Sequence, residues 1–131
     1  MNAFESLQRS IVTAWNADSD LSSLNGLYFT RGKENVDYPY AVFFLDSNTN
    51  GARTFSDSSR DFSIQFNVFS SKKSSSEINT VMEYIYTEFD SKEFTMAGGY
   101  KNTLLRRGTE SIFKNDSNNW QGTISYFTNI Y

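Results

Sequence analysis

The 131-residue chain contains neither cysteine nor histidine. Without cysteine it cannot form a disulfide bond, a thiolate metal site or a cysteine nucleophile. Without histidine it lacks the most common general base and the most common metal ligand of proteins. Carboxylates and lysine remain available for chemistry, but the missing residue types make catalysis a minor expectation. We therefore expect a protein that is not an enzyme and that has no catalytic residue, metal site or cofactor.

Positive charge and long apolar runs are also scarce. The chain has 12 basic and 15 acidic residues, which gives a net charge of -3. Binding of free nucleic acid would require a basic face, so this balance argues against it. No apolar run approaches the roughly 20 residues that span a bilayer. Glu5 and Arg9 interrupt the opening stretch where a signal peptide would be apolar. We expect no membrane association and a protein that is made and kept in the cytosol.

Aromatic residues, in contrast, are abundant. The sequence has 12 Phe and 8 Tyr, and aromatic side chains make up 17% of the chain. Each of these side chains buries a large area, so their number favours a folded protein. The length is typical of one domain with one core. We therefore expect a single domain over residues 1–131.

Two segments have the spacing of amphipathic helices. Residues 3–15 place their apolar side chains three and four positions apart, as a helix requires. A second stripe follows "SSSE", where Ser74 and Glu77 fit a capping box, and this helix is expected to stop near Asp90. Between them, Asp18 or Ser19 could cap a short turn. The expected helix-face residues are Phe4, Leu7, Ile11, Ala14 and Trp15 in the first helix, and Ile78, Val81, Met82, Ile85 and Phe89 in the second.

Several segments are typical of strands. "RDFSIQFNVFS" (60–70) alternates apolar and polar residues except at Phe69. A strand is also predicted to begin at Pro39, and its residues 41–45, "AVFFL", are apolar enough for burial on both faces. Residues 27–30 form a short candidate, and 103–114 with 120–129 indicate a hairpin. Residues 46–59 contain Asn50-Gly51, so they form either a hairpin or a long functional loop. The order predicts an α+β fold: an antiparallel or mixed β-sheet with two α-helices packed on one face.

Motifs for chemistry are weak. "GGYKNT" (98–103) lacks the spacing of a phosphate-binding loop, and the two Asp/Asn-rich stretches lack the Gly and Glu of a calcium loop. Carboxylate pairs such as Asp57 with Asp61, or Glu83 with Asp90, could in principle serve glycoside hydrolysis. Nothing in the sequence distinguishes either pair from chance.

The second face of the predicted sheet carries an excess of apolar side chains. Alternate residues of a strand point to opposite faces of the sheet. The aromatic residues expected to point away from the core are Phe43 or Phe44, Phe69, Phe113 and Phe127. Two helices can cover one face of a sheet but not both, so some of these rings are expected to be exposed in a lone subunit. Exposed apolar patches usually mark a contact surface.

Arginine is enriched at protein interfaces and pairs specifically with carboxylates. Arg106 and Arg107 are adjacent within a predicted strand, so they are expected to point to opposite faces. They could contact a partner, or they could be edge residues that limit aggregation. The candidate residues for a subunit or tail-tube interface are Arg53, Phe55, Arg60, Phe69, Arg106 and Arg107.

The pattern as a whole resembles the tail-terminator (tail-completion) proteins of long-tailed bacteriophages. The resemblance covers nearly the full chain. It is carried by "IVTAWNADSDLSSLNGLYF", "YPYAVFFL", "FSIQFNVFS" followed by "SSSEINTVMEYIYTEFD", and the closing "NNWQGTISYFTNIY". These motifs are loose patterns of order and spacing.

The resemblance implies a small α+β protein that forms a ring, commonly of six copies (a hexamer), on the end of the finished tail tube. Such a ring ends tube growth and offers a joining surface to a head-completion or connector protein, and DNA passes through it only as cargo. The expected location is the head-proximal end of the tail in the virion, and the host cytoplasm during assembly. The resemblance transfers no catalytic residues.

Two other classes remain open at this point. The first is a small-ligand-binding α+β module with an aromatic-lined pocket between helices and sheet. The second is a carboxylate enzyme, which would hold two acids close together in a cleft.

Overall fold

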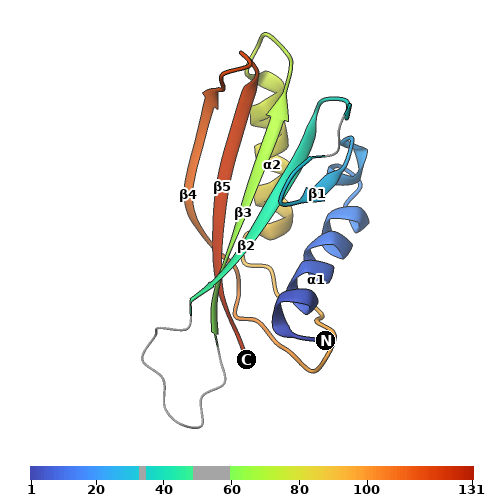
Figure 1. The fold of residues 1–131 in the computed structure, drawn as a ribbon, viewed down its shortest axis with the longest axis vertical. Coiled ribbons are helices and arrows are strands. Elements are labelled where there is room, and N and C mark those ends of the chain that lie inside the picture. Colours follow the sequence, from blue (N-terminus) through green and yellow to red (C-terminus); the bar gives the residue numbers. More distant parts are fainter. Residues whose placement is uncertain (33–34, 49–59) are drawn as a thin grey trace.

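A computed structural model of the chain describes residues 1–32, 35–48 and 60–131. The predicted order of elements is confirmed (Figure 1). The two α-helices are α1 (Ala3–Ala17) and α2 (Ser76–Phe89), and a short 3-10 helix η1 (Leu21–Ser23) follows α1. The strands are β1 (Leu27–Phe29), β2 (Tyr40–Asn48), β3 (Arg60–Ser70), β4 (Arg106–Lys114) and β5 (Trp120–Ile130).

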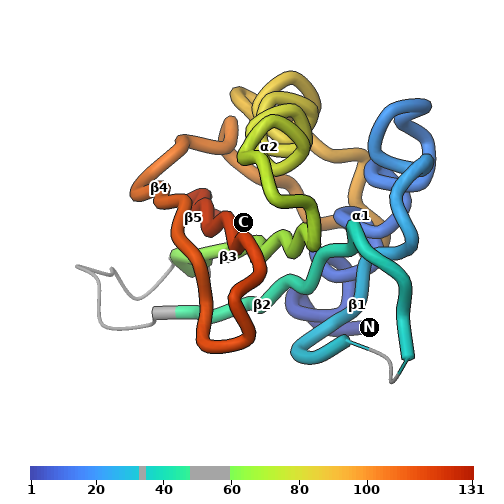
Figure 2. The backbone as a smooth tube through the Cα atoms, turned by 90° about the horizontal axis from the view of Figure 1, so that it is seen from above, coloured from blue at the N-terminus to red at the C-terminus, as the bar shows by residue number. Residues whose placement is uncertain are grey.

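The five strands form one mixed sheet in the order β1-β2-β3-β5-β4. Strand β1 runs parallel to β2, and the β2–β3, β3–β5 and β5–β4 pairs are antiparallel. Figure 2 shows α2 on one side of the sheet, and no described helix lies on the other side of β3 and β5. The predicted α+β fold, with a mixed sheet and two helices on one face, is therefore confirmed.

The core lies between this face of the sheet and the two helices. The alternating pattern of β3 directs Phe62, Ile64, Phe66 and Val68 into it, and none of these side chains is more than 1% exposed. Trp15 of α1 stacks on Phe66 with their ring centroids 5.8 Å apart. Phe66 also lies 4.9 Å from the ring of Phe89 at the end of α2. One strand thus joins both helices in a single core.

The first helix begins at a cap that the sequence pattern did not identify. The side-chain oxygen of Asn2 accepts a hydrogen bond of 2.9 Å from the backbone N–H of Glu5. This bond satisfies one of the N–H groups left without a partner at a helix start. After α1, Asp18 accepts hydrogen bonds from the backbone N–H groups of Asp20 and Leu21, both at 2.9 Å. Asp18 therefore stabilises the expected short turn.

The capping box expected at the start of α2 is wrong. Ser75 occupies the N-cap position and its side chain makes no cap hydrogen bond. Glu77 instead accepts a hydrogen bond of 2.6 Å from the hydroxyl of Ser70, the buried last residue of β3. The carboxylate is thus used to satisfy a buried hydroxyl. This bond ties the start of the helix to the end of the strand.

Two strand predictions also require correction. The first arm of the C-terminal hairpin begins at Arg106 and not at Thr103, because the backbone of Leu105 turns to bond with Lys92 and Ser91. In β2, burial on both faces fails at Phe44, which is 36% exposed because no helix covers that side of the sheet. The expected hairpin at Asn50-Gly51 lies outside the described residues.

Candidate functional site

The side of the sheet that carries no helix presents a surface of aromatic and polar side chains, which we call the open face. Its largest exposed apolar side chains are Phe44 on β2, Phe113 on β4 and Phe127 on β5, exposed by 36%, 43% and 42%. Phe43, the neighbour of Phe44, is fully buried on the helix side. The expectation of uncovered rings on this face is confirmed for these three residues.

Tyrosine and phenylalanine side chains gather at one end of the open face. The rings of Tyr40 and Phe69 stack with centroids 5.0 Å apart, and Tyr38 lies 5.4 Å from Tyr40. Burial, and secondarily the nearby Tyr38, raises the pKa of the Tyr40 hydroxyl. Phe69 is half-buried, since Tyr40 covers part of its ring. This end of the open face is a packed aromatic surface.

Amide and hydroxyl side chains occupy the centre of the open face. The side-chain oxygen of Asn67 accepts hydrogen bonds from Thr123 at 2.9 Å and from Gln65 at 3.2 Å. These bonds cross from β3 to β5 and also link two positions along β3. Because the three side chains orient one another, the centre of the face has a defined shape before any partner binds.

A cavity of about 450 Å³ lies at the other end, where β2, β3 and β5 meet the start of β4. Its charged lining residues are Asp46, Asp61 and Arg106, and Phe127 contributes an aromatic wall. Asn129 donates a hydrogen bond of 3.0 Å to Asp61 and so fixes that carboxylate. Among the described residues, no carboxylate lies within ion-pair distance of Arg106. The cavity therefore offers both signs of charge to a polar or charged group.

The six interface residues expected from the sequence are not all on this surface. Phe69 and Arg106 lie on it, at its opposite ends. Arg107 points to the helix side, which confirms that the two neighbouring arginines face opposite ways, although they open strand β4 and do not lie in its middle. Arg53 and Phe55 lie outside the described residues.

Arg60 makes contacts within the subunit. Its guanidinium lies 5.4 Å from the ring centroid of Phe4 in α1 and 5.2 Å from that of Phe62 in β3. Cations over aromatic rings at such distances are attracted by the ring electrons. Arg60 therefore links the first helix to the sheet, and this contact explains the residue without a partner protein.

Arg107 belongs to a network that holds the edge strand β4 to α2. Its guanidinium lies 3.6 Å from a carboxylate oxygen of Asp90 and 3.7 Å from one of Glu110. The hydroxyl of Tyr86 donates to Glu110, and that of Tyr126 donates to Asp90 at 2.6 Å. Burial first, and then the bond to Glu110, raises the pKa of Tyr86 to about 12. Burial and the bond to Asp90 also raise the pKa of Tyr126.

Sequence reasoning missed the acidic residues of the open face. Asp46 was assigned to the segment after β2, and Asp61 was considered only as one of two carboxylates without further support. The two-residue period of a strand could have identified them. Asp46 lies two residues after Phe44 and Asp61 lies eight residues before Phe69, so each points to the same face as that phenylalanine. The antiparallel register then places both residues at the same end of the sheet.

Two further searches cover the described residues only. Neither of the helices is long and apolar enough to cross a membrane. Acidic side chains do not gather there in groups of three that could hold a metal ion.

Comparison with known proteins gives a fold but no family. No model of a known protein family matches the sequence, and no curated protein matches it. Among solved structures, one similar chain superposes with a TM-score of 0.63 at 11% sequence identity, and its name states no function. The superposition covers 98% of this chain and 92% of that chain. The likeness therefore concerns the whole α+β fold.

Proposed function

We propose that the protein is a structural component of a bacteriophage tail, which assembles as a ring on the end of the tail tube, ends tube growth and forms the surface that joins the head. The observation that carries this proposal is the open face, where Phe44, Phe113 and Phe127 remain exposed on a sheet that its own helices cannot cover. A subunit that is incomplete alone suits an assembly, because contact with another protein buries these rings.

The subunit also offers different surfaces for different neighbours. A closed ring uses head-to-tail contacts, so each copy must present two unlike patches. The open face has an aromatic end around Tyr40 and Phe69, and a charged cavity around Asp46, Asp61 and Arg106. The proposed partners are other copies of the chain, the tail tube protein and a head-completion or connector protein. With a net charge of -3, the subunits would not hold DNA that passes through the ring.

A small-ligand-binding module is the second candidate, and the cavity of about 450 Å³ is the observation that favours it. Its volume falls within the usual range for ligand pockets. However, eight of its ten lining residues are polar or charged, and it opens on the sheet surface. The space between helices and sheet, where an aromatic pocket was expected, holds Trp15, Phe66 and Phe89 in contact, each at most 1% exposed. We therefore rank ligand binding below assembly.

The proposal is tested by tail assembly in cells that lack this protein. We expect overlong or headless tails in electron micrographs, and normal tails when the wild-type chain is supplied again. In vitro, the purified protein should cap purified tail tubes and sediment as a ring at high concentration. A protein that stays monomeric at every concentration, and that also ignores tail tubes, would contradict the proposal.

A further inference from the structure

Strand β4 forms one edge of the sheet, and its outer side has no neighbour among the described strands. All nine of its residues are exposed. The backbone N–H of Asn115 donates to the carbonyl of Asn119 at 2.9 Å, which fixes the phase of hydrogen bonding along the β4–β5 pair. Because bonded and non-bonded positions alternate in an antiparallel pair, the backbone groups of Ile112 and Lys114 point away from β5. Within the described residues, these donors and acceptors have no backbone partner outside the strand pairings.

Strand β2 has a second free edge, at the opposite side of the sheet. Strand β1 covers it only at Ala41–Phe43. The backbone N–H of Thr30 bonds to the carbonyl of Phe43 at 2.9 Å, so the odd-numbered residues of β2 face this edge. The same alternation puts the backbone groups of Leu45 and Ser47 there, and no described backbone group outside the strand pairings bonds to them. The uncovered stretch of β2 is thus Phe44–Asn48.

The two edges match in side-chain orientation. Ile112 lies opposite Gly122, where an added Cβ would meet Met82 of α2, so Ile112 is on the helix side of the sheet. Leu45 lies two residues after the buried Phe43 in the same strand, so it also points to the helix side. Directly paired residues of an antiparallel ladder point to the same side. Pairing Ile112 with Leu45 or Ser47 would therefore keep the helices of both copies on one side.

The edges also match in strand direction. The register of the sheet makes β4 antiparallel to β2, since three antiparallel pairs separate them. A neighbouring copy in the same orientation would therefore present its β2 antiparallel to β4. This arrangement can repeat from copy to copy, as a head-to-tail ring requires.

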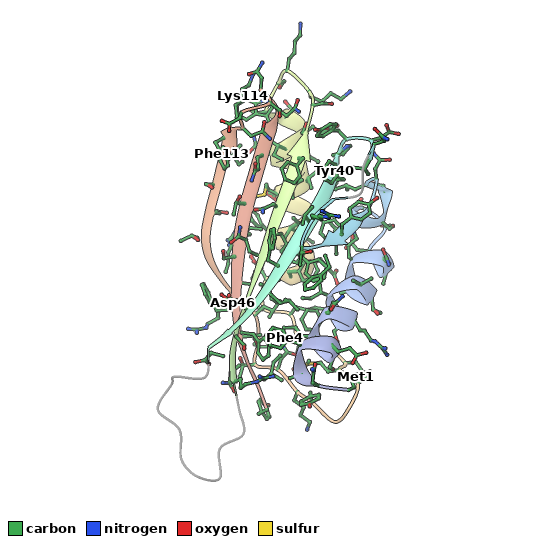
Figure 3. All side chains as sticks on the ribbon, in the orientation of Figure 1. Met1, Phe4, Tyr40, Asp46, Phe113 and Lys114 are labelled. Atoms are coloured by element: carbon green, nitrogen blue, oxygen red, sulfur yellow. The ribbon has the colours of Figure 1, made fainter. Side chains whose placement is uncertain are left out.

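The two edges carry different charges. Strand β4 carries three basic residues, Arg106, Arg107 and Lys114, against the single acidic residue Glu110. The uncovered stretch of β2 carries Asp46, and Asp61 lies beside it in the paired stretch of β3. Figure 3 shows Lys114 at the upper end of β4 and Asp46 near the lower end of β2. With Ile112 opposite Leu45 or Ser47, Asp46 lies opposite Ser111 or Phe113, so the pairing places no like charges opposite each other along Phe44–Asn48.

We propose that β4 of one copy pairs with the uncovered Phe44–Asn48 stretch of β2 in the next copy, antiparallel and with the open faces on the same side. Strand addition of this kind gains main-chain hydrogen bonds and places side chains on alternating faces. The partner is a second copy of this chain. As the contact of a tail ring, the inference rests on the proposed function, but the pairing itself is tested on the purified protein.

Disulfide trapping tests the contact directly, because the native chain has no cysteine. Asp46→Cys protein is mixed under mild oxidation with Ser111→Cys or Phe113→Cys protein, the two open-face residues that the two possible registers place opposite Asp46. We expect a covalent mixed dimer with at least one of the two, even if the contact is transient. Ile112→Cys, whose side chain lies on the opposite face, is the control and should give none. Failure of both pairs at millimolar concentration, or equal trapping by Ile112→Cys, would overturn the proposal.

A second experiment separates the backbone contact from the side chain. Ile112→Pro removes the outward N–H of β4, and an edge strand tolerates proline at such a position. Ile112→Thr changes the same side chain and keeps the N–H. We expect Ile112→Pro to weaken self-association about tenfold, because one backbone hydrogen bond is lost and its acceptor is left unpaired, with little effect of Ile112→Thr. Circular dichroism of both variants shows that they are folded. Equal association of the two variants would contradict edge pairing.

The two proposals fail in different ways. If the protein caps tail tubes but no open-face pair is trapped, the ring uses another contact and the assembly function stands. If mixed dimers form but tail tubes are ignored, edge pairing stands and the tail function fails.

Discussion

The guanidinium carbon of Arg107 lies 4.1 Å from the ring centroid of Tyr86, so the edge strand β4 is held against helix α2 by a cation–aromatic contact. Asp90 and Glu110 flank the same guanidinium at 3.6 and 3.7 Å. All nine residues of β4 are exposed, so the core does little to hold this strand. The network around Arg107 therefore fixes the position of the edge that we propose to contact the next copy.

Replacing Arg107 with alanine should lower the free energy of unfolding by about 1–2 kcal/mol. The cation–aromatic contact and two partly exposed ion pairs each contribute up to about 1 kcal/mol. Chemical denaturation measures the change. Arg106→Ala is the matched control, since this neighbouring arginine has no ion pair among the described residues, and its effect should stay within about 0.5 kcal/mol. Equal destabilisation by the two variants would show that the network contributes nothing specific.

Stability should fall in alkaline solution as the tyrosines of this network ionise. Tyr86 has a pKa of about 12 in the folded protein, above the value of 10.0 for an ordinary tyrosine. A group whose pKa is raised by folding contributes stability below its unfolded pKa and loses it as the pH rises through the folded value. We therefore expect this contribution to the free energy of unfolding to be constant between about pH 7 and 9 and to be lost between about pH 10 and 12.

Tyr126 supplies the control for this pH dependence, because its pKa is raised in the same direction by burial and by the bond to Asp90. Tyr126→Phe removes one ionisable hydroxyl. The variant should lose about 1 kcal/mol at neutral pH with its hydrogen bond, and its stability should fall less steeply above pH 10. Denaturation at a series of pH values gives both slopes. Parallel profiles for variant and wild type would exclude a contribution of Tyr126.

Gly122 allows close approach of α2 to β5, and a larger side chain there should destabilise the core. A Cβ at this position would lie 2.8 Å from the sulfur of Met82 and 3.3 Å from a side-chain carbon of Ile78. Gly122→Val should therefore cost about 1–3 kcal/mol in thermal or chemical unfolding, as overpacked cores do. Ser125→Val, on the open face of the same strand, is the control and should be nearly neutral. Adding Met82→Ala should recover part of the loss.

The sequence predicted those parts of the fold that follow from local periodicity. The alternation in β3 and the helical stripe from Ile78 to Phe89 correspond to the buried faces of these elements. The opposite orientations of Arg106 and Arg107 follow from the same two-residue period. The ends of helices and strands were harder to predict, because hydrogen bonds between distant residues decide them. Leu105 bonds to Lys92 and so lies outside strand β4. Glu77 accepts a hydrogen bond from Ser70 and so does not form the expected helix cap.

The candidate site could be predicted only in outline. Periodicity indicated that one face of the sheet would be uncovered, but strand order decides which residues meet there. Because β5 lies between β3 and β4, Asp61 and Arg106 line one cavity although they are far apart in the sequence. The stacking of Arg60 on two rings depends on the position of α1 against β3, which no local pattern encodes.

The exposed rings of the open face should matter for assembly more than for folding. Phe44 and Phe127 are 36% and 42% exposed, so Phe44→Ser and Phe127→Ser should each change the free energy of unfolding by less than about 1 kcal/mol. In an assembled ring or on a tube these rings would be buried, and their loss would then remove apolar area from the contact. We expect both variants to fold and to fail in capping purified tail tubes.

Tyr131→Ser is the matched control for this test, because Tyr131 is an aromatic residue that is 56% exposed at the end of the chain and outside the sheet. It should cap tubes as the wild-type protein does. Electron microscopy of tubes mixed with each variant measures capping, and denaturation measures folding. If Phe44→Ser and Phe127→Ser cap tubes normally, the open face is not the contact with the assembly. The uncovered aromatic residues would then be a property of the monomer alone.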